Sequence, residues 1–106
     1  MNQEFSLNIK LFQKGDKKAF KIIFDCLFEN ICLFSNRFIN NMPAAEDIAQ
    51  ETFISLWNHR EEMQSAAHIK SFLYICAHNA AIDFLKHEKI KDSYNIPAII
   101  IYFTKL

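Results

Sequence analysis

Apolar side chains recur every three or four positions along most of this chain, which is the spacing of amphipathic α-helices. Residues 5–14 form a short stripe that Gly15 ends, and Asp16 can cap the helix that follows. The longest stripe lies in residues 17–40 and predicts a helix buried along its length; its members are Phe20, Ile23, Phe24, Leu27, Phe28, Ile31, Phe34 and Phe38.

Residues 43–60 predict a third helix, which continues to Glu62. Pro43 suits a first helical position, and Glu46 and Asp47 follow where the helix dipole favours negative charge. One face is apolar and faces the core, with Phe53 at its edge; it holds Ala45, Ile48, Ala49, Thr52 and Leu56. The other face combines carboxylates and an amide with two apolar side chains, the composition of a docking surface for another protein. Its members are Asp47, Gln50, Glu51, Ile54 and Trp57.

Residues 68–89 predict a fourth helix, after a loop at 63–67 in which Ser65 is a candidate cap. The side chains expected to face inward are Ile69, Phe72, Leu73, Cys76, Ala77, Ala80 and Phe84. Those expected to project elsewhere are Tyr74, His78, Ala81, Ile82 and Leu85.

Residues 92–106 do not continue this pattern, because the residue before Pro97 disfavours the helical region and an apolar, β-prone run follows. This tail packs on the domain, joins a partner's sheet, or results from truncation or a change of reading frame. The sequence therefore predicts an all-α, compact four-helix domain over residues 1–91, with a short first helix, three longer helices and an irregular C-terminal tail.

Composition supports helices and a single core. The chain has 106 residues, of which 51% are hydrophobic and eleven are Phe, with one Gly and two Pro. Its formal net charge is zero, yet residues 46–62 hold five acidic side chains and one Arg, while lysines follow in the fourth helix. The lysines of residues 10–21 belong to a solvated corner or to a basic rim.

Candidate catalytic and metal-binding chemistry is sparse. The three cysteines form no CxxC pair, and the four histidines form no HExxH motif, so we expect no enzyme activity, no metal and no cofactor. The first residues lack a secretory pattern, and no apolar run reaches the roughly 18 to 20 residues that span a bilayer. These observations predict a cytoplasmic protein without a membrane insertion.

Three segments resemble bacterial extracytoplasmic-function sigma factors of the sigma-70 family. Residues 45–57, A-E-D-I-A-Q-E-T-F-I-S-L-W, match that family's A-E-D-x-x-Q-E-x-F-x-x-x-W pattern. Residues 15–20, G-D-K-K-A-F, look like its G-D-x-x-A-F segment, and residues 69–85 look like its final region-two helix. All three segments occur in the family's order and spacing, which makes the resemblance specific.

The resemblance implies a region-two domain that binds promoter DNA and RNA polymerase core. Asp47, Gln50, Glu51, Ile54 and Trp57 would dock on the clamp helices of the polymerase β′ subunit, although Trp57 could instead cap the bundle. Single-stranded DNA of the minus-ten element would meet the loop and the fourth helix, with Tyr74 as a stacking platform and lysines at phosphates. The implied DNA-binding residues are Met63, Gln64, Ser65, Ala66, Lys70, Tyr74, His78, Asn79, Lys86 and Lys89. Asn79 and Asp83 are equally compatible with a structural role.

The sequence departs from the family pattern in two ways. His78 stands where the family has Arg, which weakens the expected contact with DNA, because Arg is always charged. We also expect no second domain for the upstream promoter element after residue 92. The alternative function is therefore a shortened, sigma-like interaction module that titrates core polymerase or an anti-sigma factor without initiating transcription.

Overall fold

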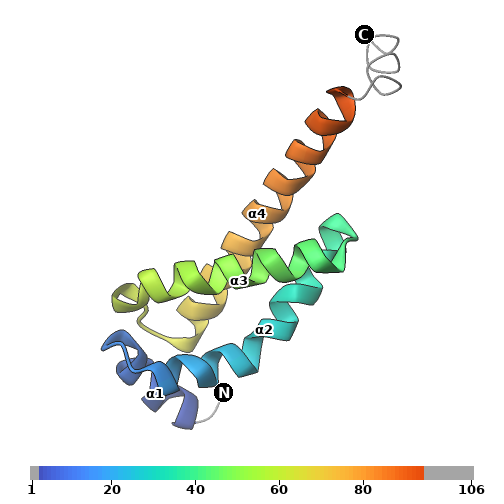
Figure 1. The fold of residues 1–106 in the computed structure, drawn as a ribbon. Helices are drawn as coiled ribbons and strands as arrows, with labels where there is room; N and C mark the ends of the chain where they lie inside the picture. The colour runs from blue at the N-terminus through green and yellow to red at the C-terminus, as the bar shows by residue number, and fades with distance from the viewer. Residues whose placement is uncertain (1–2, 95–106) are drawn as a thin grey trace.

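The computed structural model describes residues 3–94, and it describes side chains over residues 8–89. Four α-helices and one 3₁₀ turn follow in order: α1 (Gln3–Gln13), α2 (Lys17–Ile39), α3 (Met42–Asn58), η1 (Arg60–Glu62) and α4 (Ala66–Tyr94). α3 returns along α2, and α4 packs against both (Figure 1). The predicted all-α fold with a short first helix and three longer helices is confirmed.

Short polar segments set the helix boundaries. Gly15 adopts a φ of 91°, where a side chain would be strained, and Asp16 caps α2 by accepting the Ala19 amide at 3.0 Å. At the next junction Asn40 is left-handed, and the Asn41 side chain accepts the Ala44 amide at 3.1 Å. The predicted caps Asp16 and Ser65 are both confirmed, the latter accepting the His68 amide at 3.0 Å.

Four predicted helix boundaries are wrong. α3 ends at Asn58 rather than Glu62, because the His59 amide bonds to Ser55 and Leu56 and the chain tightens into η1. α3 also begins at Met42, so Glu46 and Asp47 lie beyond its first turn. α4 begins at Ala66 and runs to Tyr94, past the predicted start of the tail at residue 92; the rest of that tail, 95–106, lies outside the described residues.

The core lies where α2, α3 and α4 meet, with two α1 side chains added at one end. The predicted inward face of α3 is confirmed, since all its members and Phe53 are buried. On α4 the buried positions are four residues apart: Ile69, Leu73, Ala77 and Ala81. Ala81 is therefore inside, contrary to the prediction, whereas Phe72, Cys76, Ala80 and Phe84 are only half-buried.

α4 is longer than the bundle that supports it. Its first half packs against α2 and α3, and its second half projects beyond them (Figure 1). Ala81 is the last buried side chain described on this helix. Within residues 3–94 no helix has the length and apolarity needed to cross a membrane.

Candidate functional site

The outer face of α3 brings together four of the five predicted docking residues. Asp47, Gln50, Glu51 and Ile54 are spaced by three and four residues, so they share one side of the helix, and all four are exposed. Ile54 is 60% exposed, as much as any large apolar side chain in the described part of the chain. The four side chains therefore form one exposed face of α3, and contact of this face with another molecule stays a prediction.

Trp57 occupies a different environment from its four companions. Its ring is half-buried and lies 6.1 Å from the Phe12 ring and 5.2 Å from the Phe20 ring. The Arg60 guanidinium stacks 4.5 Å from the centre of the indole ring and also donates to the Trp57 carbonyl at 3.0 Å. Trp57 therefore joins α1, α2 and η1 while part of its surface remains accessible.

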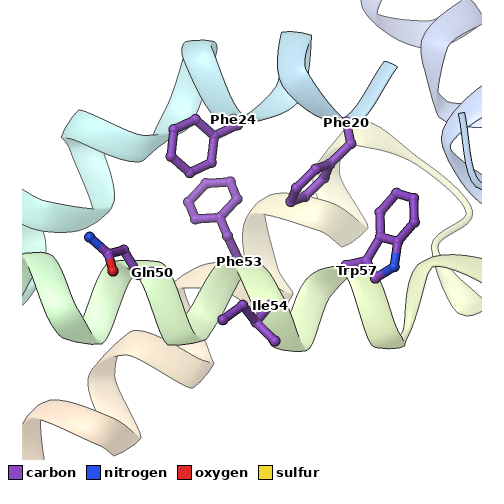
Figure 2. Close-up of a pocket in the computed structure, with 6 residues that line it drawn as sticks. All are labelled: Phe20, Phe24, Gln50, Phe53, Ile54 and Trp57. Carbon is purple, nitrogen blue, oxygen red and sulfur yellow. The ribbon is translucent and has the colours of Figure 1, made fainter. Parts of the chain in front are cut away.

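A hollow of about 350 Å³ lies beside this face, between α2 and α3. Figure 2 shows Phe20 and Phe24 from α2 facing Phe53 across it, with Trp57 at one end and Gln50 at the other; Ile54 completes the lining. The sequence pattern assigned the three phenylalanines to the core and did not predict that they line a surface hollow. The sequence feature that could have indicated this hollow is a second apolar row on α2, Phe20, Phe24 and Phe28. Each of its members follows a member of the buried row by one position.

The connection between η1 and α4 is exposed only in part. Gln64 and Ser65 are exposed and Ala66 is half-buried, but Met63 is 1% exposed and belongs to the core. The Gln13 side chain donates to the Met63 carbonyl, which fixes this loop on α1. The Met63 side chain is therefore packed in the core of the chain without DNA, and its contact with DNA stays a prediction.

The remaining predicted DNA-binding residues extend along α4. Lys70 and Tyr74 are half-buried, while His78, Asn79, Lys86 and Lys89 are exposed. Lys70, Tyr74 and His78 follow at intervals of four, so they form one row on the helix. Asp83 is also exposed, and its carbonyl contacts the His87 ring at 2.8 Å.

An aromatic chain connects this row to α2. The Tyr74 ring lies 4.8 Å from Phe34, Phe34 lies 5.2 Å from Phe38, and Phe38 lies 5.1 Å from His78, all edge to face. Phe38 is 39% exposed, although the sequence pattern placed it in the core. Phe38 and His78 thus form the exposed end of this series of ring contacts. Tyr74 lies at the other end and packs against Phe34.

The described residues were also compared with the side-chain groups that bind metal ions or react as thiols. No group of three or more His, Cys, Asp or Glu side chains among them is placed to hold a metal ion. Cys26, Cys32 and Cys76 are free thiols, and burial raises the pKa of Cys32 and Cys76.

The described part of the chain belongs to the class of small all-α domains, and most of its predicted contact residues lie on outer helix faces. Within that class the chain belongs to the sigma-70 region 2 family, whose pattern matches residues 32–90. The match begins midway along α2 and covers α3 and most of α4. The predicted resemblance to region two of extracytoplasmic-function sigma factors is confirmed.

Two relatives illustrate the similarity. The chain is 33% identical over 89 residues to the ECF RNA polymerase sigma factor SigW of Bacillus subtilis (strain 168), an alignment covering 84% of this chain and 48% of SigW. It is 31% identical over 83 residues to the RNA polymerase sigma factor CarQ of Myxococcus xanthus, covering 78% of this chain and 48% of CarQ. The chain thus spans about half the length of the curated relatives it matches. No solved structure gives a significant match.

Proposed function

We propose that residues 1–91 form a cytoplasmic sigma region-two domain that docks on the β′ clamp helices of RNA polymerase core and recognises the minus-ten element as single-stranded DNA. The observation that carries the docking half is the exposed face of α3, on which Ile54 is the apolar side chain and Asp47, Gln50 and Glu51 occupy the two preceding turns. Family membership supports the choice of partner. No cofactor or metal is needed for this binding role.

The DNA-binding half of the proposal uses the loop and one row of α4. Gln64, Ser65 and Ala66 would meet a base turned out of the stack, while lysines along α4 would neutralise phosphates. The lysines assigned to phosphates are Lys70, Lys86 and Lys89. The exposed pair Phe38 and His78 offers an aromatic surface beside this row.

Transcription from a premelted template tests the proposed role directly. A template with an open bubble at the minus-ten position bypasses the need for an upstream-element domain. If the chain initiates, adding it to core polymerase will give a discrete run-off transcript. Inhibition of a second sigma factor without a transcript of its own would instead support the alternative, a module that titrates core polymerase. An absence of any effect on core polymerase would contradict both.

His78→Arg should increase affinity for single-stranded DNA. His78 is exposed on the row that carries Lys70 and Tyr74, so an arginine there adds one permanent charge and one phosphate contact. For single strands the slope of log affinity against log salt should steepen by about 0.7. Fluorescence anisotropy with a labelled pool of single-stranded oligonucleotides measures both quantities.

The matched control is Asn58→Arg, which adds the same charge at the exposed end of α3. It should change the affinity far less than His78→Arg. Equal gains from the two substitutions would show that net charge alone matters and would remove His78 from the DNA-binding surface.

A further inference from the structure

A second hollow lies on the same pair of helices, toward the other end of α3. Its volume is about 240 Å³, and its lining comes from the C-terminal half of α2 and the N-terminal half of α3: Phe28, Glu29, Cys32, Leu33, Met42 and Glu46. Leu33 is 48% exposed and Met42 is 37% exposed. The two hollows have no lining residue in common.

Stacked aromatic rings connect the linings of the two hollows. Phe24 lines the first hollow and Phe28 the second, and their ring centres are 4.5 Å apart. Both rings also contact Phe53, at 5.0 Å and 5.9 Å. Along α3 the centres of the two linings are about nine to ten residues apart, which is about 14 Å at the helical rise per residue.

Negative charge distinguishes the second hollow from the first. Glu29 on α2 and Glu46 on α3 stand on opposite walls, and both are exposed. Their charges also reach the thiol between them: burial raises the pKa of Cys32 most, and Glu46 and Glu29 raise it further. Across the described residues the ion pair found is Lys21 with Asp25, so neither glutamate has a basic partner. No Lys or Arg occurs from residue 38 to residue 59.

We propose that the docking surface on α3 includes both hollows, which together form one docking groove, and that this groove binds a single amphipathic helix of core RNA polymerase. That helix presents two apolar side chains about 14 Å apart, or between two and three helical turns, one for each hollow. A Lys or Arg lies beside the second apolar side chain, between Glu29 and Glu46. The inference rests on the proposed polymerase-docking function and adds the length of the groove and the charge of its partner.

The test measures binding of the full chain to core RNA polymerase that lacks sigma, by fluorescence anisotropy at several salt concentrations. Leu33→Asp should weaken binding at least tenfold, and Leu33→Ala should weaken it to a smaller extent. The double charge reversal Glu29→Lys with Glu46→Lys should also weaken binding at least tenfold, with most of the loss at low salt. Circular dichroism confirms that each variant remains helical.

Matched controls carry the same changes elsewhere. Leu11→Asp alters a leucine that is 40% exposed on α1, and Glu61→Lys with Glu88→Lys reverses two exposed carboxylates outside the groove. Both controls should bind like the wild type.

The outcomes separate the inference from the function on which it rests. If Ile54→Asp abolishes binding while Leu33→Asp and the double reversal bind normally, the groove ends at the first hollow and the inference is wrong. If the wild type fails to bind core polymerase, or Ile54→Asp binds as well as the wild type, the proposed docking function itself fails, and the inference with it.

Discussion

Ile54→Asp should weaken binding of the chain to core RNA polymerase by about thirtyfold or more while leaving the fold intact. Ile54 is 60% exposed, so an aspartate there remains in solvent in the free protein. In the complex it would place a charge in the apolar centre of the interface, next to Asp47 and Glu51. Central interface residues commonly contribute 2 kcal/mol or more, which corresponds to about thirtyfold in affinity. Titration of labelled chain with core polymerase measures the change.

Ile75→Asp is a closely matched control for this substitution. Ile75 is also 60% exposed and also lies on a long helix, but it belongs to α4 rather than to the docking face. Ile75→Asp should bind polymerase like the wild type. Equal losses in the two variants would show that surface hydrophobicity in general, and not the outer face of α3, determines the affinity.

Phe53→Ala should lower the free energy of unfolding by about 3–5 kcal/mol. Phe53 is 2% exposed, and its ring contacts Phe20 at 6.3 Å, Phe24 at 5.0 Å and Phe28 at 5.9 Å. Removing the ring leaves a cavity between α2 and α3, which these contacts hold together. Since small domains are stable by about 5–15 kcal/mol, this loss is large. Urea denaturation followed by circular dichroism measures it.

Its neighbour on α3 provides the comparison. Ile54→Ala should change the same free energy by no more than about 0.5 kcal/mol, because the side chain is on the surface. A loss below 1 kcal/mol for Phe53→Ala would contradict the interpretation of this ring as a buried contact that stabilises the packing of α2 against α3.

The periodicity of the sequence was sufficient to predict the helices and the buried face of α3. Ala45, Ile48, Thr52 and Leu56 share one side of the helix because they are three or four residues apart. This side faces the core because it is mostly apolar. The same argument placed Asp47, Gln50, Glu51 and Ile54 together on the outside. Their exposure is confirmed, whereas their contact with polymerase remains a prediction.

Periodicity could not predict how far a neighbouring helix covers each face. Phe20, Phe24 and Phe28 form a row beside the buried row of α2, and whether that row is covered depends on the angle and distance between α2 and α3. The same dependence explains why Ala81 is buried and Phe38 is 39% exposed, both contrary to expectation. Met63 lies in the core because α3 ends before η1, and η1 directs the following residues toward α1.

The projecting half of α4 has a consequence for the way the protein responds to DNA. Beyond Phe84, which still packs against the core, the described side chains of α4 are all exposed, and an isolated helical segment of this length is marginally stable in water. Backbone amides should therefore exchange with solvent in two classes along one uninterrupted helix, slowly up to Phe84 and quickly beyond it. Binding of DNA to Lys86 and Lys89 would have to slow the second class, and part of the binding free energy would be spent on ordering that segment.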